Sequence, residues 1–155
     1  MMNKVEVKKL NKFFEKEFKQ QSKIAIFQNE NGTFDLFDRF IIVKEQNNFI
    51  VKVKNTYQDK SFFSLKYAVT YCIFCQKTLF AASNRLQFLD KMIESINAEI
   101  EIHKNLIKKS KDIDKKDVYL SKLTENLYRK KNFIKEADDY IMQGKSYQYK
   151  DFNNN

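Results

Sequence analysis

The residues of this sequence that could do chemistry are two cysteines, a single histidine and a cluster of lysines. Cys72 and Cys75 form a Cys-x-x-Cys pair, a spacing that occurs in zinc sites and in redox-active dithiols. A structural zinc site needs four ligands, and His103 is the only further candidate. A redox dithiol lies where a helix begins, because the helix N-terminus lowers the thiol pKa, whereas these cysteines fall inside an expected helix. We therefore expect two free thiols that act as small buried hydrophobic residues.

His103 lies between Ile100 and Ile107 in an apolar run with heptad spacing. Catalysis would need a nucleophile or several carboxylates to converge on it. A polar residue in an apolar seam more often sets the register of two helices, and we interpret His103 and Lys130 in this way. The chain carries no glycine-rich phosphate loop, serine-hydrolase elbow or His-Glu-x-x-His motif. We expect neither enzymatic activity nor a metal or cofactor.

Lysine supplies 26 of the 29 basic residues and gives the chain a formal net charge of +9. The charge is spread along the chain, whereas a nucleic-acid surface concentrates it on one face. Five lysines do cluster at an expected hairpin tip and are candidate phosphate contacts: Lys108, Lys109, Lys111, Lys115 and Lys116. Because Asp112, Asp114 and Asp117 interleave with them, we interpret this tip as a solvated loop and nucleic-acid binding as the second hypothesis.

The N-terminal part of the chain combines a helix with a small sheet. Residues 1–20 carry apolar side chains at helical spacing, which predicts an amphipathic helix. Residues 23–63 predict an antiparallel meander of three or four strands, because Asn31-Gly32 is a strong hairpin signal and alternating runs follow it at 40–45 and 49–54. Four aromatic residues of this region could stack nucleobases, but a small sheet also requires them for its core: Phe34, Phe37, Phe40 and Phe49.

Residues 64–82 predict a helix packed across the sheet. Ser64 is a suitable N-cap, because its side chain can accept a hydrogen bond from the first turn. The apolar residues that follow recur at helical spacing and predict a buried stripe: Leu65, Ala68, Val69, Cys72 and Ile73. Because neither Gly nor Pro occurs near Ser83-Asn84, the sequence leaves open whether this helix is continuous with the next one.

Residues 83–142 predict an antiparallel helical hairpin of coiled-coil character, formed by two apolar runs with heptad spacing. The first run is Leu86, Leu89, Ile93, Ile96, Ile100, His103 and Ile107, and the second is Leu120, Leu123, Leu127, Lys130, Ile134, Ala137 and Ile141. The polar segment 108–117 between them predicts a reversal that brings Ile107 to Leu120 and Leu86 to Ile141. Gly144 is then the expected C-cap, followed by a polar tail at 145–155.

Length and composition limit the remaining possibilities. At 155 residues the chain suits a single domain, which we place at residues 1–144 with an α+β fold. No apolar run exceeds the five residues 71–75, so we expect no membrane span. The first residues are charged rather than apolar, so we expect no secretory signal, and two cysteines without one favour a reducing compartment.

A pattern of core residues extends over about residues 35–142. It comprises Phe37-x-x-Phe40-x-Ile42, Phe49-x-Val51, the run from Ser64 to Ile73, Leu89-Asp90, Ile100-x-Ile102-His103 and Tyr119-Leu120-x-Lys122-Leu123. This pattern resembles a group of small uncharacterised proteins of tailed phages that infect marine bacteria. The resemblance implies a setting, namely the cytoplasm of an infected bacterium or a virion, and it implies no mechanism.

Surplus apolar surface on the hairpin indicates what the domain does. Beyond the seam, a second stripe comprises Phe88, Met92, Ile102 and Leu106 on the first arm and Phe133 and Tyr140 on the second. Because one stripe closes the hairpin, the other must meet the sheet or another chain. We expect a non-enzymatic protein–protein interaction or assembly module, with homodimerisation through the hairpin as the simplest arrangement. The alternative is nucleic-acid binding through the lysine-rich tip or the aromatic sheet face, and no membrane or small-molecule partner is implied.

Overall fold

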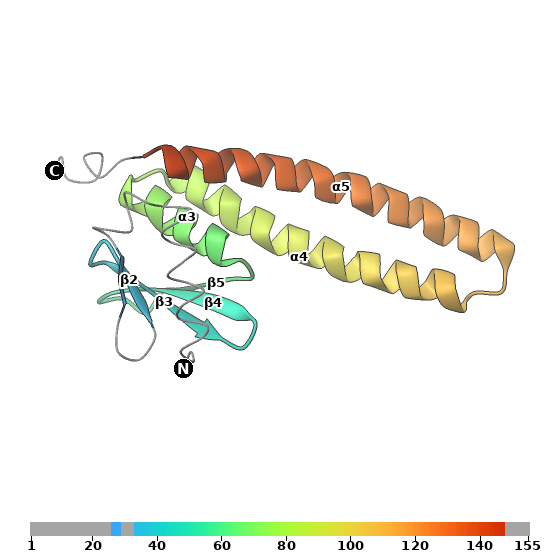
Figure 1. Ribbon diagram of the computed structural model, residues 1–155, viewed down its shortest axis with the longest axis horizontal. Helices are drawn as coiled ribbons and strands as arrows, with labels where there is room; N and C mark the ends of the chain where they lie inside the picture. Colours follow the sequence, from blue (N-terminus) through green and yellow to red (C-terminus); the bar gives the residue numbers. More distant parts are fainter. Residues whose placement is uncertain (1–25, 29–32, 148–155) are drawn as a thin grey trace.

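The computed structural model describes residues 26–28 and 33–147, which form an antiparallel sheet, a short helix and a long helical hairpin (Figure 1). The predicted α+β class is confirmed. The predicted helix at 1–20, the Asn31-Gly32 turn and most of the predicted tail lie outside the described residues. In Figure 1 the short helix lies between the sheet and the base of the hairpin, and the outer part of the hairpin extends away from the sheet.

Five strands form the described part of the sheet, one more than the largest number predicted. Each is antiparallel to the next along the chain, in the order β1-β2-β3-β4-β5. The last strand reads Asp-Lys-Ser-Phe and has one apolar residue, so it forms because the edge of its neighbour supplies hydrogen-bond partners rather than through its own pattern. The bounds are Ile26–Gln28 (β1), Phe34–Leu36 (β2), Phe40–Glu45 (β3), Asn48–Val53 (β4) and Asp59–Phe62 (β5).

One face of the sheet forms a hydrophobic core. Its fully buried residues alternate along the strands, as the pleat requires, and they are Leu36, Phe40, Ile42, Val51 and Phe62. Phe37 and Phe49 pack against this cluster. The side chain of Phe34 is outside the described part. The other aromatic residues considered as a stacking surface are therefore core residues.

The short helix α3 (Leu65–Gln76) is buried on almost every side. Ser64 caps it as predicted, since the Ser64 Oγ accepts a hydrogen bond from the backbone N–H of Tyr67. Every residue from 68 to 75 is buried, so the predicted stripe is only part of the surface that this helix covers. A helix that is apolar all round has to be enclosed by other elements.

Two hydrophobic cores meet at α3. Val69 and Cys72 belong to the sheet cluster, whereas Phe74 belongs to a second cluster at the base of the hairpin. The other buried members of this basal cluster are Leu86, Leu89, Ala137 and Ile141. Leu86 and Ile141 therefore share one cluster, as predicted for the base of the hairpin.

The predicted helix 64–82 corresponds to α3, a break and the first residues of the next helix, so the two helices whose continuity the sequence left open are separate. Three residues separate the end of α3 from the start of α4 (Phe80–Lys109). Thr78 adopts a left-handed backbone conformation with φ of 59°, and the chain reverses there without glycine or proline. Ser83 is buried inside α4, where its hydroxyl donates to the carbonyl of Phe80 at 2.9 Å.

A buried carboxylate ties the start of α3 to α4. Asp90 accepts hydrogen bonds from the backbone N–H groups of Phe63 at 2.9 Å and Ser64 at 3.2 Å. Burial raises the pKa of Asp90, and these two hydrogen bonds oppose that shift. The contact satisfies two donors at the point where the chain leaves the sheet.

The two long helices α4 and α5 (Ile113–Ser146) form the predicted antiparallel hairpin. Helices of 30 and 34 residues are about 45 and 51 Å long. Asp112 caps α5, because its Oδ1 accepts hydrogen bonds from the N–H groups of Asp114 and Lys115 at 2.9 and 3.4 Å. The outer part of this hairpin therefore rests on contacts between its own two arms (Figure 1).

The seam of α5 differs from the predicted one. In α4 every predicted seam residue is buried or half-buried. In α5 the prediction is wrong at Leu120 and Leu127, which are each 47% exposed, whereas Asn126 is buried. Near the base α5 keeps the predicted frame, with Ile134, Ala137 and Ile141 facing inward. A second heptad frame also faces inward and comprises Tyr119, Leu123, Asn126, Lys130, Phe133, Ala137 and Tyr140. Phe133 and Tyr140 pack on the basal cluster, and the helix orientation that turns them inward turns the two leucines outward.

Gly144 is not the C-cap that the sequence predicted, because α5 continues to Ser146. It is buried where α5 passes α3, and a Cβ atom at this position would lie 2.9 Å from Cγ2 of Thr70. Thr70 is held in place because its hydroxyl donates to the carbonyl of Lys66 at 2.9 Å. The glycine therefore permits a close approach of two helices.

Gly144→Ala should lower the free energy of unfolding by about 1–3 kcal/mol, because the new methyl group overpacks against Thr70. In an unhindered helix interior the same change would raise stability by about 0.5–1 kcal/mol. Thr70→Ser removes the opposing methyl group and keeps the hydroxyl, so Gly144→Ala in that background should recover most of the loss. Urea unfolding of the four proteins measures this coupling. An equal effect of Gly144→Ala in both backgrounds would contradict the close contact.

Candidate functional site

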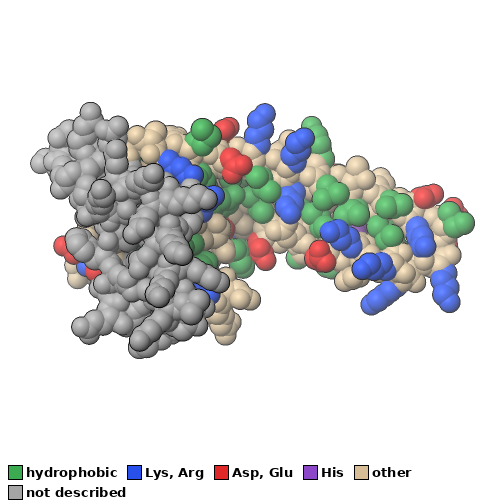
Figure 2. All heavy atoms as spheres, in the orientation of Figure 1, with side chains coloured by type: hydrophobic (Ala, Val, Ile, Leu, Met, Phe, Trp, Pro, Cys, Tyr) green, Lys and Arg blue, Asp and Glu red, His purple; other side chains and the backbone are tan. Residues whose placement is uncertain are grey.

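Exposed apolar side chains gather on the outer part of the hairpin. Of the twelve large hydrophobic residues that are exposed in the described part of the chain, seven lie between residues 102 and 128. They are Ile102, Leu106, Ile113, Val118, Leu120, Leu127 and Tyr128. Figure 2 shows hydrophobic side chains interspersed with Lys and Arg along this protruding part. A single exposed leucine is ordinary, whereas this concentration of exposed apolar side chains makes the outer hairpin the candidate interaction surface.

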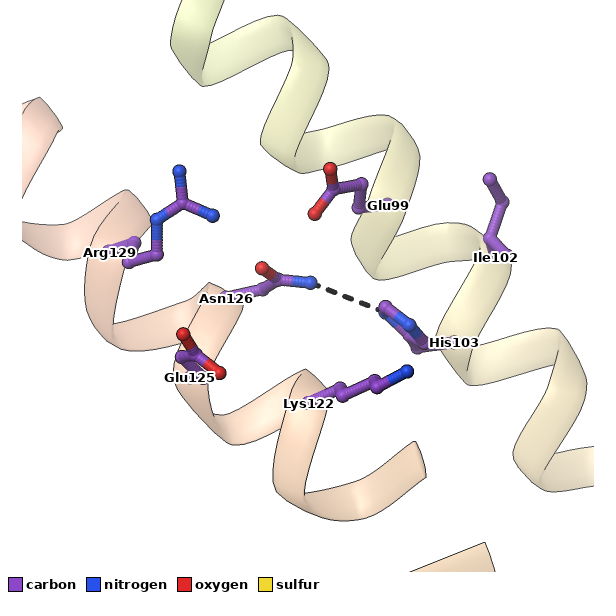
Figure 3. Close-up of a pocket in the computed structure, with 7 residues that line it drawn as sticks. All are labelled: Glu99, Ile102, His103, Lys122, Glu125, Asn126 and Arg129. Carbon is purple, nitrogen blue, oxygen red and sulfur yellow. Dashed lines mark hydrogen bonds between the residues drawn. The ribbon is translucent and has the colours of Figure 1, made fainter. Parts of the chain in front are cut away.

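An open groove of about 470 Å³ lies between the two arms in this region. A hydrogen bond of 3.3 Å joins Nδ2 of Asn126 to Nδ1 of His103, and Figure 3 shows these side chains pointing at one another across the groove. The pair is satisfied when the imidazole Nδ1 is unprotonated and accepts from the amide. The lining residues are Glu99, Ile102 and His103 of α4 and Lys122, Glu125, Asn126 and Arg129 of α5.

The groove is lined mainly by charged and amide side chains. Its lining includes no hydroxyl or thiol, so His103 has no nucleophile to activate there. Two acidic and two basic side chains balance the formal charge of the lining. Within residues 26–28 and 33–147, no group of three or more His, Cys, Asp and Glu side chains could hold a metal ion.

The cysteine pair lies in α3, away from the groove. Cys72 and Cys75 are both buried and free, as predicted. Burial raises the pKa of the Cys72 thiol well above its ordinary value, and the neighbouring Cys75 adds to the shift. A thiol that stays protonated is a poor nucleophile and a poor metal ligand, which agrees with a packing role.

The six residues predicted to bind a partner fall into two groups. Four lie on α4 and are exposed or half-buried: Phe88, Met92, Ile102 and Leu106. Phe133 and Tyr140 of α5 instead pack against the basal cluster, and the Tyr140 ring meets the Phe74 ring edge-on at 5.9 Å between centroids. The second stripe of α4 is therefore accessible, whereas the two aromatic residues of α5 are largely used inside the chain.

An ion pair joins the two arms near the base of the hairpin. Arg85 of α4 donates through Nε and Nη2 to the two carboxylate oxygens of Glu136, at 2.6 and 2.9 Å. The hydrogen bond from Arg85 lowers the pKa of Glu136. The guanidinium carbon also lies 4.9 Å from the ring centroid of Phe88. Arg85 therefore contacts both Glu136 of α5 and the ring of Phe88 of α4.

The tip of the hairpin is basic. Residues 104–122 contain seven lysines and three aspartates, a net charge of +4. Four of the five predicted phosphate contacts are exposed, and Lys116 is half-buried. Residues 90–103 of α4 contain four acidic residues and one lysine, a net charge of −3 with His103 neutral. The fold therefore brings the lysines on either side of the turn together at one end of the hairpin, with an acidic stretch nearer its base.

Comparison with protein-family models, curated proteins and solved structures finds no match to this chain. Among the described helices, none has both the length and the apolar character needed to cross a membrane. Function is therefore inferred from the surfaces that the fold exposes.

Sequence reasoning missed Asn126, the inward partner of His103. A signal for it exists, because Tyr119, Asn126, Phe133 and Tyr140 are spaced seven residues apart. These residues mark the second heptad frame, which overlaps the leucine frame along the same helix. Leucine is the usual residue of such a seam, so the leucine frame was the one predicted.

His103→Leu or Asn126→Leu alone should lower the free energy of unfolding by about 1–2 kcal/mol, because each leaves the other polar group in the seam without its partner. The double variant should recover most of the loss, with a coupling energy of about 0.5–1.5 kcal/mol in urea unfolding. Leu127→Ala tests whether Leu127 or Asn126 is the seam residue at this point of α5. If Leu127 were a seam residue its truncation would cost about 2–5 kcal/mol, whereas the exposed side chain should cost less than about 1 kcal/mol.

Proposed function

We propose that this protein is a non-enzymatic protein-interaction module whose helical hairpin carries the contact surface. The observation that supports this proposal is the set of seven exposed apolar residues between positions 102 and 128, on an element that extends away from the sheet. The sheet and α3, in contrast, enclose most of their large apolar side chains in the two cores. The phage-protein resemblance suggests that the module acts in an infected bacterial cytoplasm or in a virion.

Burial of this surface against a partner would offset much of the free-energy cost of association. A Leu or Ile side chain contributes about 1.5–3 kcal/mol when it is fully buried, so seven partly exposed residues can supply on the order of 5–10 kcal/mol. This is comparable with the about 4–15 kcal/mol that association costs in lost freedom of motion. Charged side chains around the apolar residues would then select the partner and its orientation.

A photo-crosslinking amino acid at Ile113 or Leu127 should form adducts with a partner protein in cells that make the chain. The same amino acid at Tyr57, which is fully exposed in the connection between β4 and β5, should form few, because among the described residues of the sheet region the only other exposed large hydrophobic residue is Phe63. Gel shifts and mass spectrometry of the adducts measure the difference. Adducts at Tyr57 as frequent as those on the hairpin, or none at either hairpin position, would contradict the proposal.

A second candidate function is nucleic-acid binding by the tip. The net charge of +4 within the contiguous residues 104–122 favours it, because a nucleic-acid surface concentrates basic charge on one part of the molecule. Asp112 is engaged as the cap of α5, so its carboxylate is directed at the backbone. Lysines at such a tip would contact phosphates as point charges.

If the tip binds nucleic acid, the affinity should fall about a hundredfold or more between about 50 and 200 mM salt, because phosphate neutralisation releases counterions. Fluorescence anisotropy with labelled DNA and RNA measures this. Glutamine at Lys108, Lys109, Lys115 and Lys116 should abolish binding. The control variant carries glutamine at four lysines outside the tip, Lys52, Lys60, Lys131 and Lys135, and should retain most of the affinity. Flat anisotropy at both salt concentrations would exclude this candidate.

A further inference from the structure

We propose that the outer part of the hairpin binds an amphipathic helix of another protein, whose apolar stripe is flanked by acidic side chains. The partner helix would lie on the same side of the hairpin as α3, between α3 and the tip. This inference rests on the proposed function, and it names the side of the hairpin that is used and the chemistry of the partner.

A row of apolar residues on α5 runs from the tip of the hairpin to its base. Its members are seven residues apart, and positions seven apart lie within about 20° of one another around a helix. They are Ile113, Leu120, Leu127, Ile134 and Ile141. Ile113 is 74% exposed, and Leu120 and Leu127 are each 47% exposed. Ile134 is half-buried, and Ile141 is buried, so the row is covered at the base and open toward the tip.

The element that covers the base of this row is α3. Ile141 belongs to the same buried cluster as Phe74 of α3. Three residues further along α5, Gly144 lies against Thr70 of α3. At the base of the hairpin, α3 is therefore a third helix that packs on the side where the apolar row lies.

The α4 arm extends past α3 on the same side. Asp90, Asn97 and Lys104 are also seven residues apart on α4. Asp90 accepts hydrogen bonds from the backbone N–H groups of Phe63 and Ser64, so α3 begins beside it. Asn97 and Lys104 lie further out, where Figure 1 shows the hairpin extending beyond α3. Among the described helices and strands, none lies over this outer part of the two arms.

The heptad spacing of the row makes a helix the expected occupant. Two heptad frames that overlap on one helix allow it to pack against two other helices. In α5 the frame that contains Asn126 faces α4, and the row that contains Leu127 lies on the side of a third helix. At the base this third helix is α3, and beyond α3 its place is open. A partner helix with apolar residues at three- and four-residue spacing would fill that place.

Basic side chains border the open part of the row and set the charge of the partner. They are Lys104 and Lys108 on α4 and Lys116 and Lys131 on α5. The acidic residues at the same place are Glu101 and Asp117, and Glu101 is paired with Lys104 at 3.7 Å. Four lysines against two acidic residues leave a surplus of +2. Acidic side chains on either side of the partner's apolar stripe would complement this surplus.

The same charge argues against two occupants from the chain itself. A second copy would bring two basic surfaces together, and like charges repel. Residues 1–20, which the sequence predicts to be amphipathic, contain six lysines and three glutamates and are also basic. They precede β1, which is the edge strand farthest from β5, whereas β5 is the strand that contacts α4. A helix of a different protein therefore fits the surface best.

The size of the surface indicates a reversible complex. The open part of the row, from Ile113 to Lys131, spans about 27 Å, and a helix is about 10 Å wide. The contact therefore covers roughly 300 Å² of the hairpin, less than the about 800 Å² per partner of a standard stable interface. We expect a dissociation constant in the micromolar range.

Fluorescence anisotropy with a designed probe tests the chemistry of the partner. The probe is a labelled helical peptide of about 21 residues with leucine at the a and d positions of its heptads and glutamate at the e and g positions. The matched peptide carries lysine at e and g. The acidic peptide should bind at micromolar concentration and about tenfold or more tightly than the basic peptide. Equal affinities, or no binding of either peptide at about 200 µM, would overturn the inference.

Two leucine substitutions test the row itself. Leu120→Ser with Leu127→Ser removes its apolar centre and should weaken binding of the acidic peptide about tenfold or more. Val118→Ser is the matched control, because Val118 is 52% exposed and lies about 200° around the helix from Leu120. It should leave the affinity unchanged, and circular dichroism checks that each variant keeps its helices. An equal loss with Val118→Ser would overturn the assignment of the surface.

Charge reversal tests the complementarity. Lys108→Glu with Lys131→Glu should weaken binding of the acidic peptide about tenfold or more, because both lysines border the row. Lys109→Glu with Lys122→Glu makes the same change of charge elsewhere, since Lys109 is turned about 100° from Lys108 and Lys122 lines the groove. This control pair should have a much smaller effect. Equal losses from the two pairs would overturn the inference.

A photo-crosslinking amino acid at Leu120 identifies the occupant in cells that make the chain. Mass spectrometry should map the adducts to a segment of another protein with heptad apolar spacing and acidic flanks, and the same amino acid at Val118 should form fewer. Adducts to residues 1–20, to a second copy or to nucleic acid would overturn the inference. Adducts to a protein segment without that pattern would overturn it and leave the proposed function standing, whereas no adduct from any hairpin position would contradict both.

Discussion

The burial of α3 between two hydrophobic cores is the constraint on which the rest of the structure depends. Every residue from 68 to 75 is buried, so this helix needs the sheet on one side and the hairpin on the other. Neither layer closes its core without α3. Two details serve the same junction. Gly144 lets α5 pass close to Thr70, and Asp90 satisfies two backbone N–H groups where the chain enters α3.

The basal cluster also decides how α5 is oriented along its whole length. Phe133 and Tyr140 pack toward the base of the hairpin, and a helix is stiff enough to carry that orientation outward to the tip. Asn126 consequently points into the seam, where it binds His103, and Leu120 and Leu127 point outward. The chain thus places a polar contact inside the hairpin and apolar side chains on its surface. For an isolated chain this arrangement is unfavourable, whereas for a chain with a partner it is useful.

The hairpin has a polar contact inside and apolar side chains on its surface. The His103–Asn126 contact fixes how the two arms align, because any shift of register leaves both groups without a partner. This alignment also sets how the groove-lining side chains of α4 and α5 are positioned relative to one another along the hairpin. A rigid hairpin that projects from a small packed body is well suited to present such a surface.

Local sequence patterns by themselves determined the α+β class, the antiparallel hairpin, the Ser64 cap and the buried cysteines, because strand and helix periodicity and capping depend only on near neighbours. Tertiary structure decided the rest. Thr78 takes a left-handed conformation where the chain turns back, and Gly144 is a packing residue only because Thr70 lies opposite. Two heptad frames overlap in α5, share three residues and differ elsewhere by single-residue steps. Periodicity weighs these frames almost equally. Both contribute to the basal cluster, and only the packing of α5 against α4 places Asn126 rather than Leu127 in the outer seam.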